Sequence, residues 1–182
     1  MSEIVQRKTK SENRIEITLA RWRVPIGFAC AGAVLYLAQP TPRSLAMGGA
    51  IALLGEMVRV WAAGHLEKGR EVTQSGPYRL TRHPLYAGSA IIALGAAIAS
   101  ARLSAMVLIA AYMAATIISA IRHEEASMRA SFGGQYDAYA QSRGAPVERP
   151  FSLARAIKNK EHKSVAGLAA VAAILAAKAY WK

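Results

Sequence analysis

Residues 76–88 read GPYRLTRHPLYAG and place charged, aromatic and proline side chains between two apolar stretches. Residues 75–78 are predicted to form a turn, because proline fixes its own φ angle and glycine accepts most backbone conformations. Pro84 suits the first turn of a helix, and His83, directly before a proline, is predicted to be extended. Arg82 and His83 would then lie beside a helix N-terminus, where a carboxylate or phosphate binds well. Such residues also favour lipid headgroups, so an interfacial anchor is an equal alternative.

The second polar stretch, residues 122–151, contains Glu124 and Glu125, the one adjacent acidic pair in the sequence. Neighbouring positions on a helix point about 100° apart, so the two carboxylates need not share a task. Glu125 has the i,i+4 spacing for an ion pair with Arg129, which is worth about 0.2–0.5 kcal/mol on a helix. Glu124 has Met128 at that spacing. We therefore expect Glu124 to be the better candidate for binding a cationic ligand.

Two tyrosines follow this acidic pair. The Phe-Gly-Gly sequence at residues 132–134 is predicted to end the helix, and Tyr136 and Tyr139 come next at helical spacing. Their rings can cover a ligand or pack at the membrane interface. An anion site in one stretch and a carboxylate in the other would together suit a zwitterion that carries an extra cation. S-adenosyl-L-methionine, with its carboxylate, ammonium and sulfonium, is such a ligand.

The composition indicates a membrane protein. The chain has 182 residues, enough for one domain; 53% are hydrophobic and the net charge is +12. A nucleic-acid-binding protein would spread its basic residues over a polar face without long uncharged runs. Here the charges are segregated from apolar blocks, so no nucleic-acid partner is expected. Cys30 is the single cysteine, which excludes a disulfide framework or cysteine metal cluster within one chain, and no metal site is predicted.

We predict an all-α, polytopic integral membrane protein with about five transmembrane helices and a cytoplasmic cofactor pocket. The hydrocarbon core of a bilayer requires roughly 17–25 apolar residues of a helix that spans it. The alternative is a soluble bundle with very buried helices. The predicted spans are residues 24–38, 44–64, 84–100, 103–121 and 165–181.

The positions of Lys and Arg predict the orientation of these spans. Residues 1–23 contain six of them, residues 65–83 contain four and residues 122–163 contain eight. The opposite connections contain only Arg43 and Arg102. With five spans, the three basic segments all fall on one side, which we expect to be the cytoplasm.

Residues 1–182 are therefore predicted to form a single membrane domain. Residues 1–23 would be a cytoplasmic tail, residues 65–150 a cytoplasmic cofactor region, and the C-terminus would lie outside. We expect such a protein in the inner membrane of a bacterium.

The sequence GPYRLTRHPLYAG resembles the central motif of the isoprenylcysteine carboxyl methyltransferase family and its phospholipid methyltransferase relatives, written roughly as GPYxxxRHPxYxG. Residues 123–141, HEEASMRASFGGQYDAYAQ, resemble the second motif of these enzymes, EExxLxxxFGxxYxxY. Residues 59–67, RVWAAGHLE, resemble the stretch that often precedes the two motifs. The order matches too, since the motifs flank a helical hairpin, and the resemblance covers about residues 55–150.

The resemblance implies an integral-membrane methyltransferase that uses S-adenosylmethionine. The cofactor would enter from the cytosol and a lipophilic acceptor from the bilayer. Residues 70–73 align with a cofactor-contacting segment that eukaryotic enzymes tend to begin with histidine, where this chain has Arg70. Tyr78 and residues 83–86 match cofactor-binding positions of the family, and Glu124 matches its cofactor-binding glutamate. The expected cofactor-binding residues are Arg70, Glu71, Val72, Thr73, Tyr78, Arg82, His83, Pro84, Leu85, Tyr86, Glu124 and Glu125.

One departure from the family pattern concerns the acceptor. Enzymes acting on prenylated cysteine place an arginine four residues before the glutamate, where it can face the substrate carboxylate. This chain has Ala120 there, and Arg122 lies on a different helical face, about 160° away. The reaction class survives, but a prenylcysteine substrate does not follow. We expect a lipophilic or isoprenoid-like acceptor that presents a carboxylate, thiol or amine, with membrane lipids as partners.

Ionisable residues inside the second predicted span are candidates for the acceptor side. Glu56 and Arg59, at i and i+3, can neutralise one another, and this pairing is the favoured interpretation. Ionisable groups at membrane depth also mark ligand paths, and His65 could join them at the cytoplasmic rim. Together with Arg122 these are the substrate-side candidates, and no residue is assigned as catalytic.

Two other functions fit part of the pattern. NADPH-dependent membrane sterol reductases carry a similar RHPxY segment, but they usually have asparagine where this chain has Leu85, and they lack the second motif. A small membrane scaffold or transporter would give no reason for His83 and Glu124 to face one compartment.

Overall fold

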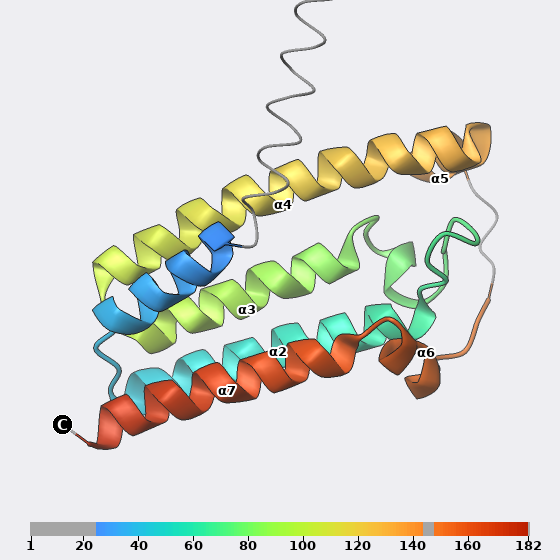
Figure 1. The fold of residues 1–182 in the computed structure, drawn as a ribbon. Coiled ribbons are helices and arrows are strands. Elements are labelled where there is room, and N and C mark those ends of the chain that lie inside the picture. The colour runs from blue at the N-terminus through green and yellow to red at the C-terminus, as the bar shows by residue number, and fades with distance from the viewer. Residues whose placement is uncertain (1–24, 144–147, 182) are drawn as a thin grey trace, which may run out of the picture.

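The structure is a computed structural model that describes residues 25–143 and 148–181. The described residues form an all-α fold, in which long helices lie side by side and the short helices and loops gather at one end (Figure 1). The first helix is Pro25–Leu37. The others are α2 (Pro42–His65), η1 (Gly76–Arg79), α3 (Pro84–Ser100), α4 (Leu103–Phe132), α5 (Gly134–Ala140), α6 (Leu153–Lys158) and α7 (Glu161–Tyr180).

Three of these helices, α2, α4 and α7, are long and apolar enough to cross a membrane. The first helix and α3 are apolar but shorter. The all-α prediction is confirmed, and the apolar helices agree with a multi-pass membrane protein. The predicted cytoplasmic tail, residues 1–23, lies outside the described residues.

The predicted end of the fourth span, at residue 121, does not coincide with a helix end. Helix α4 continues to Phe132, because the polar residues that follow the apolar run still favour a helix. It ends where expected, before Gly133, whose φ of 48° lies in a region that glycine adopts freely. As the helical spacing predicted, the turns beyond residue 121 carry Glu124 and Glu125 on the helix.

Helices α2 and α3 pack through glycines. A Cβ on either Gly55 or Gly88 would lie 2.7 Å from the carbonyl oxygen of the other glycine. Gly48 and Gly95 meet in the same way further along the pair. Small residues let helix backbones approach closely where lipid supplies no hydrophobic driving force. The contact fixes α3, and with it the motif at its N-terminus, against α2.

The turns of the first motif follow the prediction in part. Residues 76–79 form a single 3₁₀ turn, and α3 begins at Pro84. His83 is non-helical as expected, but its ψ of 56° falls short of extended backbone. Its carbonyl oxygen accepts hydrogen bonds from the backbone N–H groups of Tyr86 and Ala87. His83 is therefore the N-cap of α3, and its backbone bends towards the first turn of the helix.

Helix α7 packs along α2 and brings the C-terminal part of the chain against the start of the bundle (Figure 1). Lys178 donates hydrogen bonds to the carbonyl oxygens of Leu35 and Tyr36, at 2.8 and 2.7 Å, which terminate the first helix. Cations stabilise the carbonyl end of a helix, so this contact ties the last helix to the end of the first one.

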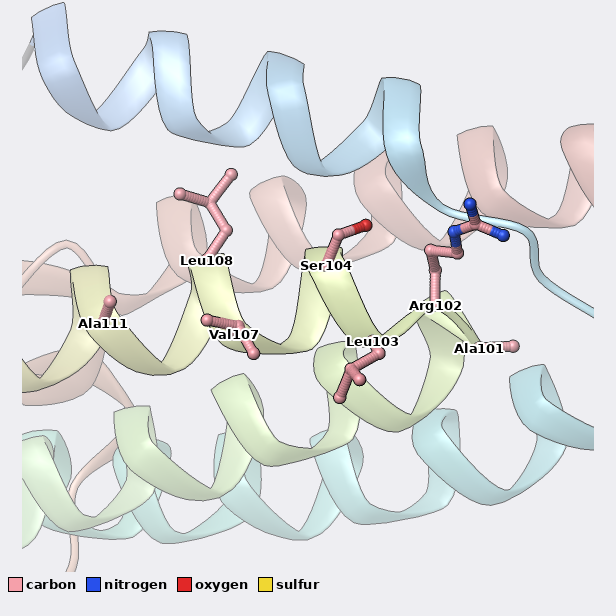
Figure 2. Close-up of a pocket in the computed structure, with 7 residues that line it drawn as sticks. All are labelled: Ala101, Arg102, Leu103, Ser104, Val107, Leu108 and Ala111. Carbon is pink, nitrogen blue, oxygen red and sulfur yellow. The ribbon is translucent and has the colours of Figure 1, made fainter.

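An apolar cavity of about 970 Å³ lies at the end of the bundle opposite the loops. Figure 2 shows it along the first turns of α4, which runs between the first helix and α3. Arg102 is the one charged residue of its described lining, which contains no carboxylate and no imidazole. The lining residues are Ala101, Arg102, Leu103, Ser104, Val107, Leu108 and Ala111.

Candidate functional site

The two sequence motifs meet at the looped end of the bundle. The Nε2 atom of His83, at the start of α3, lies 3.1 Å from Oε1 of Glu125 in α4. Arg82 approaches the same oxygen at 3.3 Å, and Arg129 approaches Oε2 at 3.4 Å, the expected i,i+4 pair. Glu125 thus joins residues from both motifs and is surrounded by cationic groups.

Glu124 takes a different position from its neighbour. The sequence favoured Glu124 for charge recognition, but Glu125 is the carboxylate that contacts His83. Since neighbouring helical positions diverge by about 100°, only one of the pair can point at α3. Glu124 is exposed, and its charge adds to the effect of burial in raising the pKa of Tyr78. It therefore faces the same end of the site without touching the imidazole.

The tyrosines of the second motif pack onto the first. The hydroxyl of Tyr139 donates a 2.7 Å hydrogen bond to the carbonyl oxygen of Tyr78. Burial raises the pKa of Tyr139 to about 12, so its hydroxyl stays a neutral donor at physiological pH. The ring of Tyr136 lies 5.6 Å from the guanidinium carbon of Arg129, a cation–π distance. These contacts hold α5 over the loop that carries the RHP sequence.

A cavity of about 650 Å³ opens between these segments, a size typical of small-molecule sites. Its walls come from the first loop and from the α5 region, and they include Tyr78, Arg82 and Tyr139. Beside it, Nδ1 of His83 is buried and has no hydrogen-bond partner among the described residues. The other lining residues are Gln74, Arg79, Leu80, Thr81, Ala140 and Ser142.

The comparison with protein families decides the assignment. The family model described as phospholipid methyltransferase matches residues 44–135, just over half of the chain, and this match includes the whole first motif and the part of the second motif that carries Glu125. The chain belongs to the phospholipid methyltransferase family. Enzymes of this family use S-adenosylmethionine. No curated protein and no solved structure matches the chain.

The residues at this end of the methyltransferase fit that cofactor. Its carboxylate needs cationic or N–H donors, which Arg82, Arg79 and the N-terminus of α3 supply. Its ammonium and sulfonium need acidic or aromatic neighbours, which Glu124 and the tyrosines supply. The open Nδ1 atom of His83 is a buried polar group that a bound molecule would satisfy. The donor set and the cavity size are therefore both suitable.

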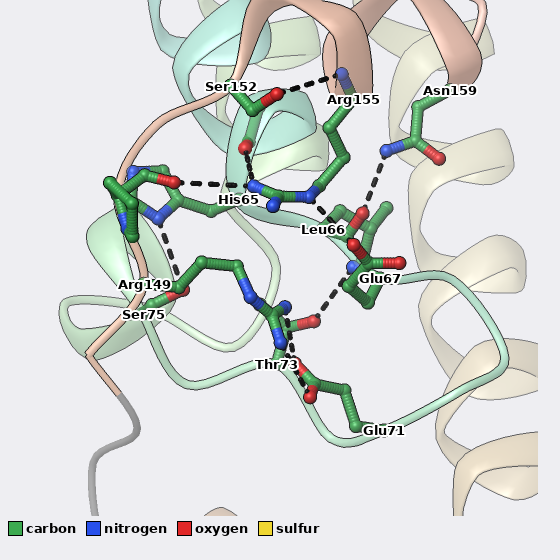
Figure 3. A network of polar contacts seen from close by, with 12 residues as sticks. His65, Leu66, Glu67, Glu71, Thr73, Ser75, Arg149, Ser152, Arg155 and Asn159 are labelled. Carbon is green, nitrogen blue, oxygen red and sulfur yellow. Dashed lines mark hydrogen bonds and ion pairs between the residues drawn. The ribbon is translucent and has the colours of Figure 1, made fainter.

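Residues 70–73 of the methyltransferase serve a supporting role in the structure. Glu71 accepts two hydrogen bonds from Arg149, at 2.6 and 2.8 Å (Figure 3). This contact with the carboxylate raises the pKa of Arg149. Val72 and Thr73 are buried, and the Thr73 hydroxyl accepts from the backbone of Glu67. Arg70 is exposed. The next residue along, Gln74, is the one that lines the cavity.

The C-terminal segment supplies most of this support, which the sequence did not predict. Arg155 donates to Glu67 at 2.8 Å and to the carbonyl oxygen of Gly64 near the end of α2, and its hydrogen bond lowers the pKa of Glu67 (Figure 3). Asn159 caps the same helix end by donating to Ala63 and Leu66 carbonyls. The sequence analysis used the basic residues of this segment only to predict the orientation of the spans. The partners of Arg155 and Asn159 lie about 90 positions earlier in the sequence, so no local pattern shows these contacts.

The substrate-side candidates are separated in space. His65 is buried at the rim and lies 3.1 Å from the Ser75 hydroxyl, within the loop network. Arg122 is exposed on α4. The remaining two, Glu56 and Arg59, lie where α2 meets α3 and α7.

The predicted pairing of Glu56 with Arg59 is wrong. Arg59 instead forms a 2.7 Å ion pair with Glu161, the first residue of α7, and also donates to Ser89 in α3. Glu56 accepts a 2.9 Å hydrogen bond from Ser164. The i,i+3 spacing took no account of α7, which lies against α2 and supplies a partner to each residue, Glu161 to Arg59 and Ser164 to Glu56.

Proposed function

We propose that this protein transfers a methyl group from S-adenosylmethionine to a phospholipid at the cytoplasmic face of a membrane. The observation that carries the proposal is the contact between His83 and Glu125, which brings the two family motifs together beside a cavity of suitable size. The basic residues of the loops and of α6 gather at this same end, as expected for the cytoplasmic side. In this arrangement the first helix, α2, α3, α4 and α7 all cross the bilayer.

The cofactor supplies an electrophilic methyl group, and the residues of the chain hold and orient the cofactor. Arg82 and the start of α3 would hold the carboxylate of the cofactor, while Glu124 faces its cationic tail. Glu125 keeps His83 and Arg82 oriented through its two carboxylate oxygens. Effective molarities for well-oriented groups reach about 10⁵–10⁸ M, so positioning alone accounts for much of the rate.

Family membership favours methyl transfer over the reductase and scaffold alternatives. A reductase would bind NADPH at this cavity, and a scaffold would bind neither nucleotide. Titration of the purified protein with S-adenosylhomocysteine and with NADPH separates the three functions. We expect binding of the first and none of the second.

The decisive test uses protein in nanodiscs of bacterial lipid extract, methyl-labelled S-adenosylmethionine and mass spectrometry of the lipid products. We expect label in a phospholipid headgroup. The matched control is Arg43→Ala, an exposed cation at the opposite end, which should methylate at the wild-type rate. An active binding site without any labelled lipid would contradict the phospholipid acceptor.

A further inference from the structure

The apolar cavity at the end of the bundle opposite the cofactor site has a graded lining. It has a volume of about 970 Å³ and runs along the first turns of α4 (Figure 2). Arg102 and Ser104 are at the start of this lining, and Val107, Leu108 and Ala111 follow along the helix. A cation and a hydroxyl therefore lie at one end and apolar side chains at the other, which is the arrangement that suits an amphiphile.

The apolar part of this cavity opens onto the surface of α4. Leu103 and Val107 are 75% and 59% exposed, and Ala105 is the single buried residue of this helix. The lining from Leu103 to Ala111 is about 12 Å long at 1.5 Å per residue. One leaflet of a bilayer contains about 15 Å of hydrocarbon, half of the full core. The cavity therefore matches the depth of one acyl chain in the leaflet at this end.

The described charged residues at this end of the bundle are all basic. Arg43 is in the first turn of α2, Arg102 precedes α4, and Lys178 bonds the end of the first helix. The stretches of sequence that form this end contain no Asp or Glu; they are residues 25–55, 84–123 and 162–181. Among the described residues, these cations therefore have no carboxylate to compensate them.

Arg102 is the cation that lines the cavity. Its side chain is exposed, and Nη1 donates a 3.2 Å hydrogen bond to Oε1 of Gln39. Gln39 is neutral, so it orients the guanidinium without compensating its charge. The other N–H groups of this side chain have no hydrogen-bond partner among the described residues. A guanidinium presents its donors as a planar fork that binds two phosphate oxygens at once.

We propose that this cavity binds an anionic phospholipid from the leaflet opposite the cofactor site, with the phosphate at Arg102 and one acyl chain along α4. The lipid is a bound partner and not the methyl acceptor, because the two cavities share no described lining residue and lie at opposite ends of the bundle. A zwitterionic headgroup would bring its own ammonium beside these cations, whereas an anionic headgroup compensates them. A second copy of the chain in the same orientation would bring further cations to this level.

The test uses the full-length protein in nanodiscs of phosphatidylcholine. Two probes, phosphatidylglycerol and phosphatidylcholine, carry the same diazirine on one acyl chain, and peptide mapping after illumination measures the label on residues 101–111. We expect phosphatidylglycerol to label these residues about fivefold more strongly, the preference that one cation near a lipid surface provides. Inorganic phosphate, which has no acyl chain, should compete no better than sodium chloride of equal ionic strength.

Three variants examine the two parts of the site. Arg102→Gln should abolish the preference for phosphatidylglycerol, and Arg102→Lys, which keeps the charge, should retain most of it. Ala111→Phe fills the apolar part and should lower the labelling by both probes, with a thermal midpoint near that of the wild type because Ala111 is exposed. The matched control is Arg43→Gln, which removes an exposed cation at the same end from outside the described cavity lining and should leave the preference unchanged.

Three results would overturn the lipid site. One is equal labelling of the wild-type protein by both probes, and another is a preference that survives in Arg102→Gln. The third is an equal loss of preference in Arg43→Gln, which would show that the overall charge of this end attracts the lipid and that Arg102 has no special part. None of these readouts requires methyl transfer, so they judge the lipid site separately from the proposed function.

Discussion

Two carboxylates at the looped end of the molecule, Glu125 and Glu56, have opposite surroundings. Glu125 is approached by Arg82, His83 and Arg129, so every oxygen has a cationic neighbour. Glu56 has one neutral donor, Ser164, and one oxygen without a hydrogen-bond partner among the described residues. A saturated carboxylate orients its partners, whereas an unsaturated one has capacity left for a ligand. The comparison indicates a positioning role for the first, whereas the described residues satisfy the second only in part.

The largest expected effect comes from breaking the ion pair beside Glu56. Glu161→Ala leaves the mostly buried guanidinium of Arg59 without its carboxylate, and breaking a buried pair costs about 3–5 kcal/mol. We expect a lower thermal midpoint in detergent, by at least several degrees. The double variant Arg59→Met, Glu161→Met should recover most of the loss, and a double variant as unstable as the single one would contradict this account.

A smaller effect is expected from removing the imidazole at the other cluster. His83→Ala should weaken S-adenosylhomocysteine binding about 10-fold to 100-fold, because hydrogen bonds to charged groups are worth about 1.5–3 kcal/mol. Its thermal midpoint should stay near that of the wild type, unlike that of Glu161→Ala. Calorimetric titration measures the affinity, and an unchanged dissociation constant would remove His83 from the site.

Glu125→Gln should have a milder effect than His83→Ala. Its arginine partners are roughly half exposed, and ion pairs of that kind contribute at most about 1 kcal/mol. We expect less than a 10-fold loss of nucleotide affinity, because the variant loosens Arg82 and His83 without removing either. A loss greater than that of His83→Ala would show that Glu125 itself contacts the ligand.

The smallest effect concerns Tyr139 at high pH. Its pKa is about 12 in the folded protein, above the ordinary value of 10.0, so the folded state binds the proton more tightly. The resulting stability is fully present below pH 10 and is lost as the pH rises towards 12. Tyr139→Phe should flatten this alkaline loss, as measured by unfolding at pH 9 and pH 11. An equal slope in both proteins would exclude Tyr139 as its source.

Local sequence rules predicted the helices and the ends of the motifs well. Pro84 predicted the start of α3, because proline restricts the backbone and suits the first turn of a helix. Gly133 predicted the end of α4, because glycine readily adopts the positive φ angle that ends a helix. The apolar runs predicted the long helices for the same local reason. The i,i+4 contact of Glu125 with Arg129 followed from helix geometry alone.

Contacts between distant segments could not be predicted in this way. Nothing local shows that α7 lies against α2, so the true partners of Arg59 and Glu56 were missed. Which of Glu124 and Glu125 contacts His83 depends on the rotation of α4 about its axis, which only packing fixes. Arg149 and Arg155 gave a charge signal, but their contacts with Glu71 and Glu67 needed the fold.

The central claim is that the two motifs form one S-adenosylmethionine site around the 650 Å³ cavity. Ultraviolet cross-linking of labelled S-adenosylmethionine to the protein in nanodiscs, followed by peptide mapping, tests it most directly. The account predicts label on peptides that contain Tyr78 or Tyr139, suppressed by excess S-adenosylhomocysteine. Label confined to the opposite end of the bundle, around Leu103 and Val107, would contradict it.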